Sequence, residues 1–456
     1  MTTLEAAQQA LPKRRVARPR IRILDGLRLV AALLVVSWHY AAFGHGASLT
    51  PYARVPELYP VAAYGWLGVE LFFLISGFVI CMSSIGHTLR EFVTSRITRL
   101  FPAYWFGVAL TTAVLLLWPV ERSSIPLKDV FVNLTMMQSG FGIGSVDAVY
   151  WTLWAELHFY VLFALVVWRG VNYARVAAFC GAWLVAAYIG QQVGGELDLV
   201  LIADYAPFFI AGVAFFLMHH YGQKPLLWVY VAASFALGIR PVLRTLASSN
   251  NHLQEQIPQW PAVAAVALFF LLMAAVALRW LRAEWRWLGV AGAMTYPLYL
   301  IHEFIGWAIL KSLDAEIPGP VLYLGTVALM LALAYLIHRY VERLLAPKLR
   351  TAVRAILAAP TKAWQALKSN PDSGVRGPDP TPVIQASFTL IEQREGRLDH
   401  DYRATSAGNK SMMSLSPGPV SSNVTGAPVA ASTSRIRLAT LDVIELEERD
   451  PRIDGS

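Results

Sequence analysis

Two ionisable side chains, Arg28 and His39, lie within one long apolar segment near the start of the chain. In an α-helix their spacing returns to within ~20° of the same face and separates them by roughly 16 Å along the axis. Ionisable groups in membrane-spanning helices are costly and usually face a bundle interior or a water-filled cavity, so each is a functional candidate. A neutral imidazole can accept a proton from a reacting group, and a guanidinium can bind phosphate through paired hydrogen bonds. This face therefore predicts a proton acceptor at one end and an anion-binding group at the other.

Other apolar segments carry further candidates. With the chain start placed in the cytoplasm, the outer halves of three other segments hold Glu70, Glu156, His302 and Glu303, near the expected level of His39. Arg96 and Arg99 instead lie with Arg28 at the inner side, in the stretch SRITRLFPAYW that we expect to join the second and third segments. We therefore expect a polar cavity in the outer half and an anion-binding cluster at the inner side.

Each candidate also has a structural alternative. Positive residues such as Arg96 and Arg99 are typical of the cytoplasmic ends of membrane helices. Glu156 has the aromatic neighbours Trp151 and Tyr160, which fit either an interfacial aromatic belt or a platform on which a sugar stacks. A lone membrane histidine is often a packing residue, but the arginine on the same face favours a functional His39.

The composition is that of a membrane protein. Of the 456 residues, 56% are hydrophobic and 15% charged, and the mean hydropathy is +0.47, which leaves too little polar surface for a soluble globule. The net charge of +8 comes from basic residues between apolar runs, so we expect membrane lipids as partners and no nucleic acid. Cys81 and Cys180 show no ligand-type spacing, and we expect packing residues rather than a disulfide or metal site.

The apolar runs predict an all-α membrane protein, a bundle of about ten transmembrane helices, because a spanning helix needs roughly 20 mostly apolar residues. The candidate segments are 28–44, 66–84, 101–119, 150–168, 174–190, 200–218, 225–241, 260–279, 289–310 and 319–338. Basic residues gather in alternate connections, which places both termini in the cytoplasm and the protein in the cell (inner) membrane. The basic start leads directly into the first segment, so we expect no cleaved signal peptide.

We expect three regions along the chain. Residues 1–22 form a basic cytoplasmic N-terminal segment, 23–350 the transmembrane domain, and 351–456 a cytoplasmic, largely disordered C-terminal tail. From about residue 360 the tail is rich in Ser, Pro, Gly, Thr and Ala, a composition that cannot bury enough apolar surface to order itself.

Several motifs stand in a fixed order along the chain: RILDGLRLVAALLVVSWHY, GVELFFLISGFVI, SRITRLFPAYW, WTLWAELHFYV and TYPLYLIHE. Together they resemble the acyltransferase 3 family of membrane proteins, over about residues 20–345. In this resemblance the family's Arg–ten residues–His motif falls on Arg28 and His39, and its Arg-x-x-Arg motif on Arg96 and Arg99. Its Trp-x-x-x-x-Glu-x-x-x-Tyr motif falls on Trp151, Glu156 and Tyr160, and its Tyr-Pro-Leu-Tyr-x-x-His motif on Tyr296, Tyr299 and His302. Leu29 departs from the family, which often has Gly there, and this bears on helix packing.

The resemblance implies O-acyl transfer, commonly of acetyl from acetyl-CoA, onto a hydroxyl of a carbohydrate, glycolipid or other cell-envelope acceptor. An acyl-CoA would then be a co-substrate, with no tightly bound cofactor. His39 would remove the hydroxyl proton or carry the acyl group itself, and His302 would support it or donate to the thioester oxygen. Arg28, Arg96 and Arg99 would bind the phosphates of coenzyme A, and Glu156 would have a catalytic role in orienting the acceptor. Further residues would bind the substrate: Trp151, Tyr160, Glu70, Tyr296, Tyr299 and Glu303.

Two other functional classes compete with this interpretation. A transporter or flippase would use the same buried Arg, His and Glu residues as a substrate or proton path. We detect no internal repeat and no matching pair of Gly- or Pro-broken helices, which disfavours it. A sensor or scaffold that recruits partners through the tail would leave the shared face of Arg28 and His39 unexplained. The residues leave open the acceptor, the acyl chain and the choice between direct transfer and an acyl-histidine intermediate.

Overall fold

Helices make up the regular structure of the part of the chain that is described. The computed structural model describes residues 20–43, 55–118, 126–253 and 256–369. Its first half contains α2 (Arg22–Ser37), η1 (Trp38–Phe43), α4 (Tyr59–Ala62), η2 (Gly65–Leu67), α5 (Gly68–Ser84), α6 (Leu89–Leu117), α7 (Leu127–Asn133), η3 (Gln138–Phe141), η4 (Ala148–Tyr150), α8 (Trp151–Trp168) and α9 (Tyr173–Val193). The second half contains α10 (Gly195–Leu201), α11 (Ala206–Tyr221), α12 (Pro225–Leu253), α13 (Trp260–Ala277), α14 (Trp287–Ile301), α15 (Glu303–Leu313), α16 (Gly319–Leu336), η5 (Ile337–Glu342) and α17 (Arg343–Ser369).

The predicted all-helical membrane fold is confirmed. Within the described ranges, nine helices are long and apolar enough to cross a membrane, and they coincide with nine of the ten predicted segments. The remaining segment, 289–310, is two shorter helices, because α14 ends at Ile301 and α15 begins at Glu303. The protein is therefore a multi-pass membrane protein that contains one interrupted apolar segment.

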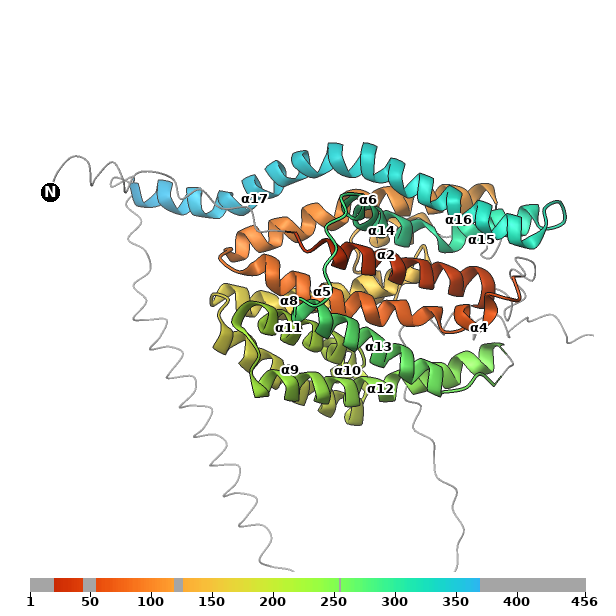
Figure 1. Ribbon diagram of the computed structural model, residues 1–456. Helices are drawn as coiled ribbons and strands as arrows, with labels where there is room; N and C mark the ends of the chain where they lie inside the picture. Colours follow the sequence, from red (N-terminus) through yellow and green to blue (C-terminus); the bar gives the residue numbers. More distant parts are fainter. Residues whose placement is uncertain (1–19, 44–54, 119–125, 254–255, 370–456) are drawn as a thin grey trace, which may run out of the picture. The chain divides into compact units, whose positions relative to one another are not determined.

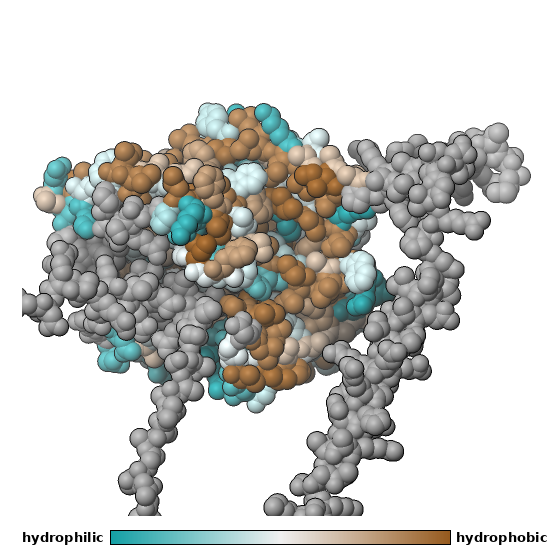
Figure 2. Space-filling model, turned by 180° about the vertical axis from the view of Figure 1, so that it is seen from behind, coloured by the Kyte–Doolittle hydropathy of each residue, from teal (hydrophilic) through white to brown (hydrophobic). Residues whose placement is uncertain are grey.

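Helices α5 and α11 form the centre of the bundle. Helix α5 packs against both α11 and α2, and α2 packs in turn against α14, so that these elements run side by side (Figure 1). In the apolar stretch of the span that contains α5, 83% of the residues are buried, whereas in the apolar stretch of α9 33% are buried. Apolar side chains also cover much of the face seen in Figure 2, and leucines such as Leu116, Leu165 and Leu271 are exposed. Exposed apolar residues of this kind suit contact with lipid chains.

The start of α6 corrects one expectation. Arg96 and Arg99 were expected in a connection between two helices, but α6 begins at Leu89 and carries both of them. Thr88 caps the helix by a capping box, in which its side chain and that of Glu91 each accept a backbone N–H hydrogen bond. The arginines lower the local hydropathy, which is why the apolar run alone marks only the second part of this helix.

Two stretches that contain ionisable residues form π-helix rather than α-helix. The π-helix η1 contains His39, and the second π-helix, η5, joins α16 to α17. Helix α17 extends to Ser369, beyond the predicted boundary at 350, and crosses from one compact unit of the chain into a second that begins at Ile356. The remainder of the predicted tail, and residues 1–19 of the basic N-terminal segment, lie outside the described residues.

Candidate active site

A cavity of about 840 Å³ opens among α2, α5, α6, α8, α14, η5 and the first turns of α17. Five arginines line it: Arg28 from α2, Arg96 and Arg99 from α6, and Arg343 and Arg350 from α17. Its size falls within the roughly 300–1,000 Å³ of small-molecule sites. The structure therefore brings together the three residues that the sequence predicts to bind an anion, and we call this space the arginine cavity.

The arginines on α6 are held in different ways. Arg96 donates hydrogen bonds to the hydroxyls of Ser83 and Ser95, at 3.3 and 2.9 Å, and its guanidinium lies 5.8 Å from the ring centre of Tyr160. Arg99 lies 3.7 Å from a carboxylate oxygen of Glu342 and is 41% exposed. Neutral hydroxyls leave the positive charge of Arg96 uncompensated at these contacts, so this side chain is well suited to an anionic ligand.

Glu156 shares the arginine cavity with these cations. It accepts a 2.6 Å hydrogen bond from the hydroxyl of Ser76 and interacts electrostatically with Arg28. Ser76 lies about 9 Å of helix rise beyond Glu70 on α5. The expected common level of Glu156 and Glu70 is therefore wrong, because α8 meets α5 beside the arginines.

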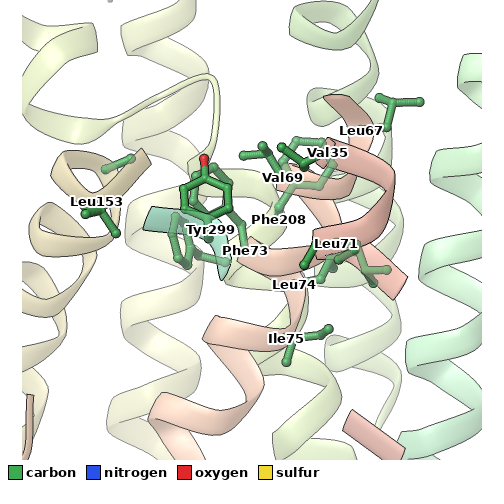
Figure 3. Packing of buried hydrophobic residues seen from close by; sticks show 14 of the residues in the cluster. Val35, Leu67, Val69, Leu71, Phe73, Leu74, Ile75, Leu153, Phe208 and Tyr299 are labelled. Carbon is green, nitrogen blue, oxygen red and sulfur yellow. The ribbon is translucent and has the colours of Figure 1, made fainter. Parts of the chain in front are cut away.

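Two tyrosines of α14 also line the arginine cavity. Tyr296 donates a 3.2 Å hydrogen bond to the carbonyl of Leu100 and lies under the Arg99 guanidinium. Tyr299 forms a 2.9 Å hydrogen bond with the hydroxyl of Thr152, which is another lining residue. Figure 3 shows Tyr299 among buried apolar side chains, of which Val69, Phe73 and Leu153 also line the cavity.

His39 and His302 form a second cluster, which adjoins the arginine cavity through Tyr299. The His302 ring centre lies 5.6 Å from that of Tyr299 and 5.0 Å from that of His39. Tyr40 donates a 2.6 Å hydrogen bond to the His302 carbonyl, and Trp307 a 2.9 Å hydrogen bond to the His39 carbonyl. A continuous series of side-chain contacts thus joins the cavity to His39.

The hydrogen bonds assign the tautomer of each neutral imidazole. His302 Nδ1 lies 2.9 Å from the carbonyl of Tyr299, which can only accept, so Nδ1 carries the proton and Nε2 a lone pair. That lone pair faces His39 Nδ1 at 3.2 Å, and His39 Nδ1 also lies 2.9 Å from the carbonyl of Val35. His39 Nδ1 must therefore donate, and the lone pair of neutral His39 is on Nε2. This nitrogen is the one available to take a proton.

Carboxyl groups lie on the Nε2 side of His39. The nearest oxygen of Glu303 is 3.5 Å from Nε2, and the other oxygen of Glu303 accepts a 2.9 Å hydrogen bond from the backbone N–H of Val149. Asp147 is hydrogen-bonded to Glu303 and fully buried. Burial raises the pKa of Asp147 to about 7.

The predicted site residues thus divide into two groups. The arginine cavity contains Arg28, Arg96, Arg99, Glu156, Tyr160, Tyr296 and Tyr299, and the second cluster contains His39, His302 and Glu303. Trp151 and Glu70 belong to neither: the Trp151 ring packs 5.0 Å from that of Tyr205, and Glu70 interacts electrostatically with the same tyrosine.

Five ionisable residues near these groups are absent from the predicted set, and two of them, Arg343 and Arg350 of α17, line the arginine cavity. Asp147 lies just before η4 in a connection with no motif that would have marked it. His338 and Glu342 line the arginine cavity and lie 2.6 Å apart. A single acidic residue within the basic stretch HRYVERLLAPKLR was a signal that could have identified Glu342.

Several known proteins are similar in sequence to parts of this chain. The chain is 28% identical over 156 residues to the exopolysaccharide production protein ExoZ of Rhizobium meliloti, covering 33% of this chain and 49% of ExoZ. It is 33% identical over 118 residues to protein 2 in the picA locus of Rhizobium radiobacter, covering 24% of this chain and 54% of that protein. It is 26% identical over 193 residues to the "Putative peptidoglycan O-acetyltransferase YrhL" of Bacillus subtilis, covering 37% of this chain and 28% of YrhL.

The matched region is therefore about half, or less, of the length of these relatives, and no solved structure matches the chain. The family model described as an acyltransferase domain matches residues 21–339. That range contains the arginine cavity's three motif arginines and the whole His39 cluster. This chain belongs to the acyltransferase 3 family.

Proposed function

We propose that this protein is a membrane-bound O-acyltransferase that moves an acyl group, by preference acetyl, from cytoplasmic acyl-CoA to a hydroxyl of a cell-envelope or secreted carbohydrate. The observation that carries the proposal is the series of contacts from the arginine cavity through Tyr299 and His302 to His39. In this proposal the contacts connect a site for the anionic donor to a separate group that accepts the proton.

The donor would enter the arginine cavity from the cytoplasm. The guanidinium groups of Arg28, Arg96 and Arg99 suit the phosphates of coenzyme A, because each can donate paired hydrogen bonds to phosphate oxygens. The pantetheine arm would then extend along α2 toward His39. Both chain termini would lie in the cytoplasm, together with the basic residues that flank α2 and α17.

His39 would act from its Nε2 atom. In direct transfer, Nε2 removes the acceptor's hydroxyl proton while the oxygen attacks the thioester carbon; in the covalent variant, Nε2 is itself acylated first. The hydrogen bonds to Nδ1 support either variant, since they hold the imidazole in the tautomer that leaves Nε2 free. Of the two roles expected of His302, support of His39 and donation to the thioester oxygen, we therefore propose the first.

The proposed class of acceptor rests on the names of two relatives. ExoZ is named for exopolysaccharide production and YrhL for peptidoglycan O-acetylation, and both names point to carbohydrate hydroxyls. We therefore propose an envelope or secreted glycan as the acceptor. Mass spectrometry of envelope glycans from cells with and without the protein would identify the acceptor as the glycan that loses an ester.

Acyl transfer by the purified protein in lipid nanodiscs tests the proposal. With radiolabelled acetyl-CoA and an envelope-glycan extract, we expect His39→Ala to abolish transfer, while His220→Ala, at an exposed histidine of α11, preserves it. Transfer by folded His39→Ala protein at the wild-type rate would refute the role of His39.

Binding of acetyl-CoA separates the enzyme from a transporter. We expect Arg28→Gln and Arg99→Gln to weaken binding at least tenfold, and Arg169→Gln, at an exposed residue that follows α8, to leave it unchanged. Equal affinity in all three variants would contradict the donor site.

A further inference from the structure

A pair of buried carboxyl groups lies next to His39. Asp147 comes from the connection before η4 and Glu303 from the first position of α15, and their relative exposures are 0% and 3%. The two side chains are hydrogen-bonded to each other. Among the described residues, Asp147 Oδ2 has no hydrogen-bond donor. Glu303 is the last residue of the TYPLYLIHE motif, whereas Asp147 lies outside all the motifs that carry the family resemblance.

The contact requires a proton. A carboxylate has only acceptor oxygens, so two carboxyl groups can form a hydrogen bond only when one of them is protonated. Glu303 already accepts the backbone N–H of Val149 at 2.9 Å, which favours its anionic form. Asp147 has a longer contact with the same N–H, at 3.4 Å, and burial raises its pKa to about 7. The two carboxyl groups therefore share one proton and one negative charge, and Glu303 is the member of the pair that faces His39.

We propose that Asp147 and Glu303 form a proton-sharing pair that keeps one negative charge beside His39 Nε2 and stabilises the imidazolium formed during acyl transfer. This inference rests on the proposed function. Glu303 Oε1 lies 3.5 Å from Nε2, longer than the usual hydrogen bond of about 2.9 Å but close enough for a strong charge interaction in a buried site. Glu303 is thus a positioning and charge-balancing residue, and Asp147 acts through Glu303.

The proton balance of the direct reaction shows where the pair acts. The acceptor O–H bond breaks and its proton goes to His39 Nε2 as the new C–O bond forms. The C–S bond then breaks with its electron pair going to sulfur, and Nε2 returns the proton to give the free thiol. The pair gains and loses no proton, and its single negative charge faces the positive imidazolium in the interval between the two transfers.

Other titratable groups surround the pair. His39 and His302 face it from η1 and from the break between α14 and α15. The phenols of Tyr40, Tyr150 and Tyr299 interact with it from η1, η4 and α14. Phenols normally remain neutral near pH 7, so the charge of the site near that pH is set by the histidines and the carboxyl pair.

Glu303→Gln and Asp147→Asn distinguish the two roles. Glu303→Gln removes the carboxylate that faces His39, and we expect kcat to fall about 10- to 100-fold, as for other residues that act through a catalytic group. KM for acetyl-CoA should stay unchanged, since Glu303 does not line the arginine cavity. The amide of Asp147→Asn can donate the same hydrogen bond to Glu303, so we expect kcat within about threefold of wild type at pH 6. Glu316→Gln, at an exposed residue after α15, is the matched control.

The pH profile gives a readout that a purely structural role would not move. Above about pH 7 the wild-type pair loses its shared proton and becomes doubly negative, so kcat should change near that pH, and Asp147→Asn should lack this inflection. Wild-type kcat in Glu303→Gln, or an unchanged inflection in Asp147→Asn, would overturn the proposal.

Infrared spectroscopy tests the shared proton without any enzyme assay. At pH 6 the wild-type protein should show a protonated-carboxyl band that is lost in Asp147→Asn and retained in Glu316→Gln. Absence of that band overturns the inference even if acyl transfer is confirmed. Presence of the band with no acyl transfer in any glycan extract would show that the pair exists and that the proposed function has failed. If Asp147→Asn does not fold, the wild-type protein provides the test, because the same band should disappear as the pH is raised through 7.

Discussion

The crossing of α5 and α11 depends on two glycines that allow backbone to meet backbone. A Cβ atom at Gly77 would lie 2.2 Å from the carbonyl oxygen of Phe209, and one at Gly212 would lie 2.0 Å from that of Leu74. Both clashing atoms belong to helix backbone, so relief requires the two helices to separate. Small residues at such crossings let membrane helices approach closely.

Gly77→Ala and Gly212→Ala should therefore each destabilise the protein. Overpacking costs roughly 1–3 kcal/mol, and a backbone clash belongs at the upper end of that range. The helix propensity of alanine returns about 1 kcal/mol, which leaves a net loss of about 2 kcal/mol in the free energy of unfolding. Because the shift per kcal/mol becomes smaller as a protein becomes larger, it is about 1–2 °C per kcal/mol for this chain, and Tm should fall by about 2–4 °C. The double variant should lose less than the sum, because one separation of the helices relieves both clashes.

Thermal unfolding in detergent, followed by the fluorescence of the 15 tryptophans, measures these shifts. Gly325→Ala is the matched control, because a Cβ at this position of α16 meets nothing within 4 Å. Its Tm should stay equal or rise slightly, through helix propensity. A Gly212→Ala protein as stable as Gly325→Ala would refute the close approach of α5 and α11.

Two hydrogen-bond predictions can be checked by the same unfolding experiment. Thr88→Ala removes the capping box that Thr88 forms with Glu91 and should cost about 1 kcal/mol of stability. Ser76→Ala removes the 2.6 Å donor to the Glu156 carboxylate and should cost about 1.5–3 kcal/mol. Ser84→Ala is the control for Ser76, because the Ser84 hydroxyl bonds only a carbonyl of its own helix, and a loss as large as that of Ser76→Ala would contradict the assignment.

The number and type of elements could be predicted from the sequence because the bilayer imposes them. A spanning helix needs a long apolar run, and such runs are visible without knowledge of packing. The prediction was wrong where polar residues interrupt a run, as at the start of α6, whose arginines lie within the helix. It also treated 289–310 as one helix, although α14 and α15 are separated at His302.

The candidate site was predictable only in part. Helical spacing and motifs identify residues such as Arg28 and His39, which contribute to the site from a single segment. The contact of Glu156 with Ser76, and that of Asp147 with Glu303, join segments far apart in the chain. Such contacts depend on how the helices pack, and no local pattern encodes them.

The π-helices η1 and η5 have a consequence for how this sequence can change. A π-turn has one more residue than an α-turn, so each is equivalent to a single-residue insertion accommodated within a continuous helix. In η1 the wide turn carries His39, and in η5 it carries His338 and Glu342. Removal of one residue from η1 would restore a regular helix and change the directions in which the side chains of that turn point relative to α2. Gain or loss of a single codon there is thus a discrete step that re-aims side chains while leaving the length and hydrophobicity of the membrane span almost unchanged.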